Sequence, residues 1–202
     1  MQTEIELKLA IANSDIPLLL QQPLLAAAPQ KQLLHNIYFD TPELDLTQKK
    51  MALRLRLVNS QWVQTLKGGG KVEGGLHQRQ EWEVPVAGEQ LDFAQLRSSP
   101  WSELFNADMQ SRLQPIFETN FWRSTWLLHM SKGTIELALD VGQAQAKGQS
   151  TPICEVELEL KSGAADAIGE LAAILQASVP LQPENRSKAD RGYRLYLGAI
   201  AK

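Results

Sequence analysis

Hydrophobic and charged residues alternate with a period of two in four segments of this chain. Residues 3–9 read TEIELKL, 54–57 read RLRL, 79–84 read RQEWEV and 155–160 read EVELEL. Because successive side chains of a β-strand point to opposite faces, each segment predicts a strand with one charged face and one apolar face. The recurrence of this division along the chain predicts a sheet that closes around charge.

The charged positions in these segments are sorted by sign. Acids dominate residues 3–9 and 155–160, arginines occupy 54–57, and 79–84 carry a mixture. An ordinary exposed sheet face also alternates, but such faces usually mix Thr, Ser, Gln and scattered charges. Acids on one face repel each other unless divalent cations lie between them, and arginines repel unless a polyanion does. The pattern therefore favours a site for metal ions and phosphate.

The rest of the pattern predicts further strands, with helices at a few places. Strands are expected near 34–40, 51–59, 61–67, 77–86, 114–131, 133–140 and 152–161. Helices are expected after Ser14 or Asp15, over 24–33, within 91–110, over 164–179, and over 187–197 behind a cap at Asn185 or Ser187. We interpret the glycines at 68–70 as a turn between strands. These elements predict an α+β fold, a closed barrel of about eight mostly antiparallel strands with helices packed outside.

Composition narrows the class of protein. The 202 residues suit one domain over 1–202, with 44% hydrophobic residues and no composition shift between halves. The net charge of -3 provides no overall basic field for nucleic acid, so any polyanion site must be local. The single cysteine, Cys154, excludes an internal disulfide, and its apolar strand phase predicts a packed thiol. No export signal or membrane span is visible, so we expect a cytoplasmic protein without a membrane partner.

Carboxylates and cations fall in phase on the predicted strands. The carboxylates are Glu4, Glu6, Glu155, Glu157 and Glu159, and the cations on strands are Lys8, Arg54, Arg56, Lys67, Arg79 and Arg123. Lys188 could reach in from the predicted last helix. Oxygen ligands without Cys/His spacing suit Mg²⁺ or Mn²⁺, and the basic groups could hold several phosphates. The alternative is a set of cross-strand ion pairs that fills the barrel and leaves no activity. A hydrated tunnel that admits a ligand avoids the desolvation cost of that arrangement.

The motifs of this chain resemble those of the CYTH, or triphosphate tunnel metalloenzyme, superfamily. Residues 4–8 (EIELK) are similar to its N-terminal signature, which is weak alone. Five further blocks follow in the superfamily's order, namely 36–41 (NIYFDT), 53–56 (LRLR), 64–67 (QTLK), 155–159 (EVELE) and 187–193 (SKADRGY). Within the superfamily, 75–79 (GLHQR) and 152–155 (PICE) most resemble the N-terminal domain of bacterial inorganic triphosphatases.

The resemblance implies hydrolysis of inorganic tripolyphosphate, a small polyanion, to pyrophosphate and phosphate in an eight-stranded tunnel. The seven cations would neutralise the phosphate chain, and Lys8, Glu155 and Glu157 would take part in catalysis. Glu4 and Glu6 would hold one Mg²⁺ or Mn²⁺, and Glu155 and Glu157, with Asp140, would hold a second that positions the attacking water. Carboxylates ranked below these as metal contacts are Glu81, Glu83, Glu136 and Glu159. The first three and Asp140 are candidates for fixing the arginines.

Other functions fit the same groups. An adenylyl cyclase of the class IV type, a thiamine triphosphatase or a nucleoside triphosphatase would need the same metals and cations. A cyclase would also need a base pocket, and none can be identified among these residues. A polyphosphate-binding module without catalysis is the alternative of another class. Similar bacterial triphosphatases often continue into a helical CHAD domain, which would lie in a longer parent chain because no such segment follows Lys202.

Overall fold

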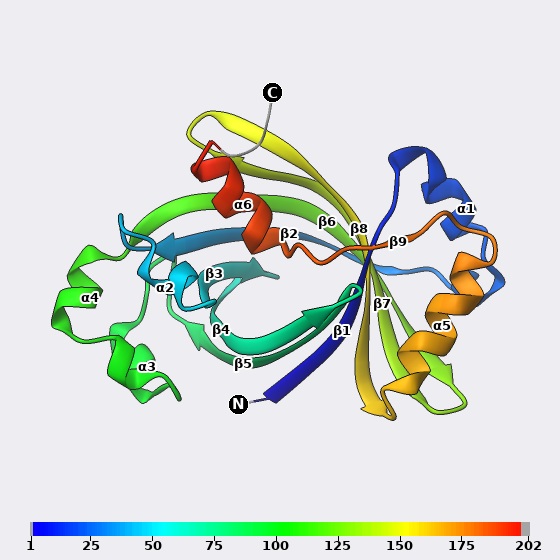
Figure 1. Ribbon diagram of the computed structural model, residues 1–202, viewed down its shortest axis with the longest axis horizontal. Coiled ribbons are helices and arrows are strands. Elements are labelled where there is room, and N and C mark those ends of the chain that lie inside the picture. Colours follow the sequence, from blue (N-terminus) through cyan, green and yellow to red (C-terminus); the bar gives the residue numbers. More distant parts are fainter. Residues whose placement is uncertain (1, 199–202) are drawn as a thin grey trace.

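The computed structural model describes residues 2–198, which form one antiparallel sheet closed into a barrel (Figure 1). Its eight main strands are β1 (Gln2–Ala10), β2 (Gln30–Asp40), β3 (Ala52–Val58), β4 (Gln61–Glu73), β5 (Leu76–Val86), β6 (Gln114–Met130), β7 (Gly133–Ala146) and β8 (Gln149–Gly163). They follow the order β5-β4-β3-β2-β6-β7-β8-β1, and pairing of β1 with β5 closes the ring. A two-residue strand, β9 (Gln182–Pro183), adds to β1. The predicted closed barrel is confirmed.

Strand β1 closes the barrel because it pairs along both of its edges. Along one edge Lys8 lies opposite Glu157 of β8, and along the other Glu4 lies opposite Arg79 of β5. This register turns the charged face of each of these strands inward and the apolar face outward. The alternation in the sequence thus determines which side chains the barrel encloses.

Two groups of helices cover the apolar outside of the barrel (Figure 1). Helices α1 (Ile16–Leu20) and α5 (Asp166–Gln176) share a core with β1, β6, β7 and β8. Helices α2 (Asp45–Gln48), α3 (Phe93–Ser98) and α4 (Ala107–Arg112) cover a second core outside β2–β5. No helix within residues 2–198 is long and apolar enough to cross a membrane.

Helix α6 (Lys188–Tyr196) packs against one end of the barrel rather than its side. Ser187 begins it with the predicted cap, a capping box in which the Ser187 side chain accepts from the N–H of Asp190. Tyr193 packs edge-on against the Phe117 ring, and its hydroxyl donates to buried Asp40 at 2.9 Å. A Cβ on Gly192 would lie 2.1 Å from the same ring, so only glycine allows this approach. The packing places Lys188 at a buried end of the barrel interior, next to Asp140 and Glu155.

Two local predictions were wrong. The helix expected over 24–33 is a single 3₁₀ turn, Pro23–Leu25, followed by β2 from Gln30, because residues 30–40 pair with β6. The glycines at 68–70 do not form a turn, since β4 runs through them to Glu73. Gly69, with φ of 57°, provides a β-bulge between Gly68 and Gly70.

Candidate active site

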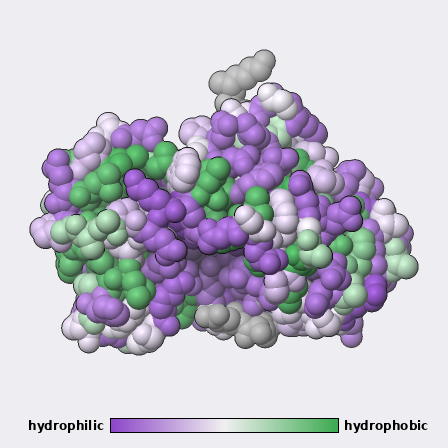
Figure 2. All heavy atoms as spheres, turned by 180° about the vertical axis from the view of Figure 1, so that it is seen from behind, coloured by the Kyte–Doolittle hydropathy of each residue, from purple (hydrophilic) through white to green (hydrophobic). Residues whose placement is uncertain are grey.

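A cavity of about 400 Å³ lies inside the barrel, so the interior is not filled by ion pairs. Seen from the side opposite to Figure 1, hydrophilic residues surround a recess near the middle of the molecule (Figure 2). The carboxylates that line the cavity are Glu4, Glu6, Glu81, Glu83, Glu136, Glu157 and Glu159. The cations are Lys8, Arg54, Arg56, Lys67, Arg79, Arg123, Lys161 and Lys188. All seven cations predicted from the sequence therefore share one cavity.

The inward side chains of β8 run from fully buried to exposed. The exposed fraction of the side chain rises from 0% at Glu155 through 8% at Glu157 and 23% at Glu159 to 36% at Lys161. Because these residues are spaced by two along one strand, they form a line from the deep end of the cavity to its open end. The site accordingly has a deep part and a shallow part.

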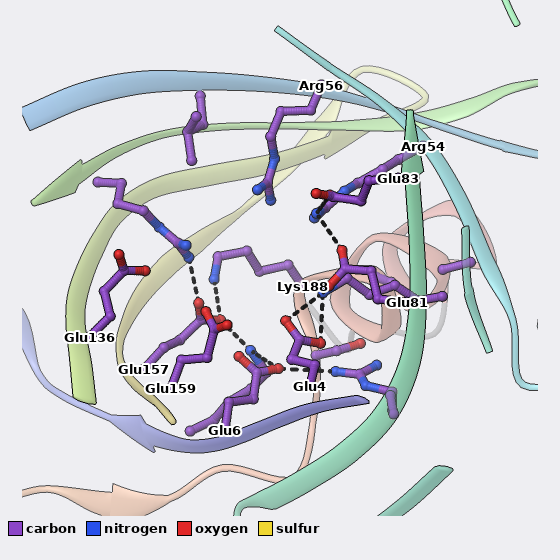
Figure 3. Close-up of a pocket in the computed structure, with 18 of the residues that line it drawn as sticks. Glu4, Glu6, Arg54, Arg56, Glu81, Glu83, Glu136, Glu157, Glu159 and Lys188 are labelled. Atoms are coloured by element: carbon purple, nitrogen blue, oxygen red, sulfur yellow. Dashed lines mark hydrogen bonds and ion pairs between the residues drawn. The ribbon is translucent and has the colours of Figure 1, made fainter. Parts of the chain in front are cut away.

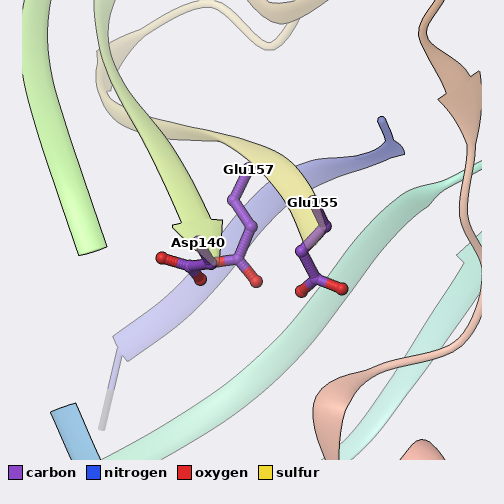
Figure 4. Close-up of side chains that lie close together, drawn as sticks. All are labelled: Asp140, Glu155 and Glu157. Atoms are coloured by element: carbon purple, nitrogen blue, oxygen red, sulfur yellow. The ribbon is translucent and has the colours of Figure 1, made fainter. Parts of the chain in front are cut away.

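The deep part is a cluster of three carboxylates, Asp140, Glu155 and Glu157, defined here as the deep triad (Figure 4). One oxygen from each lies within 4.8 Å of the others. The ammonium of Lys188 binds all three, at 2.6 Å from Asp140 and 2.8 Å from Glu157. Asp140 and Glu155 are fully buried and do not line the cavity, whereas Glu157 does.

Three further cations contact the deep triad, and one of them, Arg191, lies 3.4 Å from Glu155. Arg123 donates to both oxygens of Asp140, at 2.8 and 2.6 Å, and also contacts Glu157. Lys8 contacts Glu157 and lies 3.1 Å from Glu6. Burial alone would raise the pKa of Glu157, but Lys188, Lys8 and Arg123 together lower it well below its ordinary value. Glu157 is therefore a firmly ionised carboxylate at the centre of three cations.

The shallow part has an acidic floor, defined here as Glu4, Glu6, Glu136 and Glu159. In Figure 3 Glu4 and Glu6 of β1 and Glu159 of β8 lie in the lower half of the view, and Glu136 of β7 lies at the left. Lys67 donates to both oxygens of Glu4 at 2.8 Å, and Arg79 lies 3.4 Å from Glu6. Burial, together with the nearby Glu4 and Glu136, raises the pKa of Glu159 despite a hydrogen bond from Lys161.

The opposite side of the cavity is a wall of arginines from β3. Arg54 lies 3.7 Å from Glu81 and 3.8 Å from Glu83, and its Nε has no hydrogen-bond partner in the structure as described. Arg56 donates to the amide oxygen of Asn36 at 2.7 Å, and no carboxylate of residues 2–198 lies within 4.0 Å of its guanidinium. Figure 3 shows Arg56 extending into the cavity toward the floor. Burial and the neighbouring Arg54 and Arg123 lower the pKa of Arg56 to about 10.

The structure distributes the predicted acids over the two parts. Glu4 and Glu6 lie on the floor, Glu157 is the member of the deep triad that lines the cavity, and Asp140 and Glu155 lie behind the lining. The acids ranked lower also separate, since Glu81 and Glu83 face Arg54 whereas Glu136 and Glu159 join the floor. Sequence reasoning missed Lys161, although its spacing of two from Glu159 was a usable signal.

The donor set of the floor fits a hard divalent cation. Four carboxylates line this part of the cavity, and Mg²⁺ and Mn²⁺ prefer oxygen ligands. Burial raises the pKa of Glu159, and the charges of Glu4 and Glu136 add to this effect, so a bound cation would stabilise the ionised carboxylate. The deep triad also supplies only oxygen, but four cations, Lys8, Arg123, Lys188 and Arg191, already contact its three carboxylates. At Glu136 and Glu159 a divalent ion would displace the partly exposed Lys161 and not a buried ammonium.

A closed antiparallel barrel around paired acids and cations defines the CYTH domain class, and this chain belongs to that family. The family model of the CYTH domain matches residues 2–193, nearly the whole chain. This match confirms the family expected from the sequence motifs.

An inorganic triphosphatase of Haemophilus influenzae is 38% identical over 200 residues, which cover 96% of this chain and 55% of that protein. The chain therefore spans about half the length of this curated relative. A solved Hippeastrum protein, described as a candidate adenylyl cyclase that reveals a dominant triphosphatase activity, superposes with a TM-score of 0.71 at 22% identity. The superposition covers 98% of this chain and 97% of the Hippeastrum chain. A Pyrococcus horikoshii protein gives a TM-score of 0.61 at 22% identity, covering 97% and 99%. At this identity the two structures support the fold alone.

Proposed function

We propose that this chain hydrolyses inorganic tripolyphosphate to pyrophosphate and phosphate, with Mg²⁺ or Mn²⁺ as cofactor. The observation that carries the proposal is the pairing of Arg56, a cation without a carboxylate partner in residues 2–198, with an acidic floor across the same cavity. A phosphate chain between them would suit both sides of the cavity. Its oxygens would accept hydrogen bonds from the Arg56 guanidinium, and a divalent cation held by the floor carboxylates would neutralise its charge. The relationship to the Haemophilus inorganic triphosphatase supports the same substrate.

Glu4 and Glu6 would hold one metal ion, and Glu136 and Glu159 offer further oxygens beside them. A divalent ion bound there would neutralise phosphate oxygens and activate water for attack on phosphorus. The second ion predicted for Asp140, Glu155 and Glu157 would have to displace Lys188 from the deep triad. We therefore propose that the floor is loaded first.

The cations of the cavity would have different roles in binding the substrate. Arg54 and Arg56 would hold one side of the phosphate chain, while Lys8, Arg123 and Lys188 would neutralise the oxygens at the deep end. The remaining predicted cations, Lys67 and Arg79, hold Glu4 and Glu6 in place. Glu157 is too weak a base to take a proton, given its lowered pKa, so its part would be to fix Lys8 and Lys188. Attack of water in line breaks one phosphoanhydride bond and forms one P–O bond.

The lining of the cavity favours an inorganic substrate over a nucleotide. Among the described residues Tyr38 is the aromatic side chain of the lining, and it is buried against Phe117. A nucleobase would therefore find no exposed aromatic face for stacking in this cavity. The lining is otherwise dominated by charged groups, which suit phosphate throughout.

The decisive experiment measures phosphate release from tripolyphosphate, ATP and thiamine triphosphate side by side, with Mg²⁺ or Mn²⁺ and with chelator as control. Nucleotide products are separated to detect cyclic AMP. We expect fast release from tripolyphosphate, slow turnover of ATP, and no release with chelator.

The other outcomes would overturn the proposal in distinct ways. Cyclic AMP would indicate an adenylyl cyclase, and preference for thiamine triphosphate or ATP would indicate an organic triphosphatase. Binding of tripolyphosphate without turnover, under either metal, would indicate a polyphosphate-binding module.

A further inference from the structure

Lys161 is the cation of the cavity that neither the motifs nor the proposed reaction uses. It lies on β8, two residues beyond Glu159, at the open end of the line of inward side chains. Its ammonium lies 2.9 Å from an oxygen of Glu159 and 3.4 Å from an oxygen of Glu136 on β7. The ammonium thus bridges two strands at the acidic floor.

Within residues 2–198 the floor carboxylates have different counter-charges. Glu4 pairs with Lys67, and Glu6 with Lys8 and Arg79. Glu136 and Glu159, in the same part of the chain, form their ion pairs with Lys161. Lys161 therefore occupies the half of the floor where carboxylate oxygens are least committed to other partners.

Lys161 is also free to leave, unlike the deep lysines. Lys8 and Lys188 are at least 93% buried on their side chains and hold two or three carboxylates each. The Lys161 side chain is 36% exposed, so its ammonium can rotate into water, where hydration compensates for the ion pairs that it leaves. A flexible four-carbon stem gives it the reach to do so.

We infer that Lys161 is an exchangeable counter-cation of the acidic floor, which competes with the divalent metal for Glu136 and Glu159 and so sets the metal affinity of the site. The inference rests on the proposed metal site at the floor. An ammonium and a divalent ion cannot both bind the same two carboxylates without strong repulsion at such distances. Metal entry would accordingly displace Lys161 toward solvent.

The test compares wild type with Lys161→Met, which keeps the length of the side chain and removes the charge. Mn²⁺ binding is measured by calorimetry without substrate, and thermal unfolding is measured with and without Mn²⁺. We expect Lys161→Met to bind Mn²⁺ about three- to tenfold more tightly, as for loss of partly screened competing ion pairs. The metal-free form of Lys161→Met should have a lower melting temperature than metal-free wild type, and saturating Mn²⁺ should abolish this difference.

Two further variants make the result specific. Lys161→Arg keeps the charge and should bind Mn²⁺ no more tightly than wild type. Lys31→Met removes an exposed lysine of β2 that lies outside the cavity lining, and should change neither readout. If wild type binds Mn²⁺ and Lys161→Met binds it with the same or a weaker affinity, the inference about Lys161 is overturned and the proposed metal site stands. Failure of all variants to bind Mn²⁺ would overturn both the inference and the proposed metal site.

Discussion

Arg56 projects from β3 into the cavity and meets a side-chain amide instead of a carboxylate. Its positive charge thus has no carboxylate partner within residues 2–198, and it faces the part of the cavity where the proposed phosphate chain would lie. The lowering of its pKa by burial, Arg54 and Arg123 expresses the same lack of a counter-charge. At the scale of one residue, Arg56 is the side chain from which a bound polyanion gains most.

We expect Arg56→Ala to weaken tripolyphosphate binding by about 2–3 kcal/mol, the size of a lost charge-assisted hydrogen bond. Calorimetric titration of tripolyphosphate measures the change. Arg97→Ala, an exposed arginine on α3, is the matched control and should bind as wild type does. Equal affinities for Arg56→Ala and wild type would show that Arg56 does not contact the substrate.

Glu157→Gln should lower turnover of tripolyphosphate by orders of magnitude while binding persists. The change removes the negative charge that holds Lys8, Lys188 and Arg123 but leaves these cations in place. Steady-state phosphate release and direct binding are measured on the same preparation, after circular dichroism has shown that the variant is folded. Wild-type turnover in the folded variant would remove Glu157 from the catalytic machinery.

The same residue should make stability depend on pH. Because the pKa of Glu157 is lowered on folding, its stabilisation is fully present above its ordinary value of about 4.5 and is lost as pH falls toward the folded value. At pH 7, we expect Glu157→Gln to lower the free energy of unfolding by about 3–5 kcal/mol, the cost of breaking a buried ion pair. In urea titrations between pH 7 and 3, the gap between wild type and variant should narrow below pH about 4.5. A gap that widens would contradict the assigned ion pairs.

At the scale of elements, most strands were predictable because their alternation is independent of the rest of the fold. The errors arose where tertiary pairing overrides local pattern. Residues 24–33 contain a Leu- and Ala-rich stretch that favours a helix, but β6 offers a partner for Gln30 onward. The glycines at 68–70 suggest a turn, and only the long partner strand β5 carries β4 past them.

The same limit applies to the site. The phase of the strands identified six of the seven proposed substrate-binding cations, because phase decides which face is enclosed, and Lys188 was placed from the last helix. Phase does not decide depth, so the separation of Asp140 and Glu155 from the floor could not be predicted. That separation depends on Lys188, which reaches the deep triad from a helix 33 residues beyond Glu155.

Docking of α6 gives a prediction at this scale. In Gly192→Ala the added methyl group would lie 2.1 Å from the Phe117 ring, so α6 must shift and Lys188 with it. We expect the free energy of unfolding to fall by about 1–3 kcal/mol, as for overpacking, and turnover to fall with it. Gly169→Ala in α5 has open space around the new methyl group and should stabilise by about 0.5–1 kcal/mol. An unaffected Gly192→Ala would show that α6 does not need this contact.

At the scale of the whole molecule, the arrangement of charge predicts how many divalent ions each chain binds. We expect one ion per chain without substrate, because cations already balance the deep triad. A second ion should bind only when tripolyphosphate is present, because phosphate oxygens can then replace the triad carboxylates as partners of the Lys188 ammonium. Equilibrium dialysis with Mn²⁺, with and without a non-hydrolysable tripolyphosphate analogue, measures both numbers. Two ions in the substrate-free protein would show that the deep triad exchanges Lys188 for metal unaided.

Closure of the barrel by its first strand also affects how the chain folds during its synthesis. The partners of β1 lie far along the chain, 73 residues away in the Glu6–Arg79 pair and 149 in the Lys8–Glu157 pair. At a synthesis rate of about 5–20 residues per second, β1 waits on the order of ten seconds on the ribosome for β8. Such distant pairing predicts slow folding. The alternating charges of β1 that later line the cavity would meanwhile discourage the unpaired strand from aggregating.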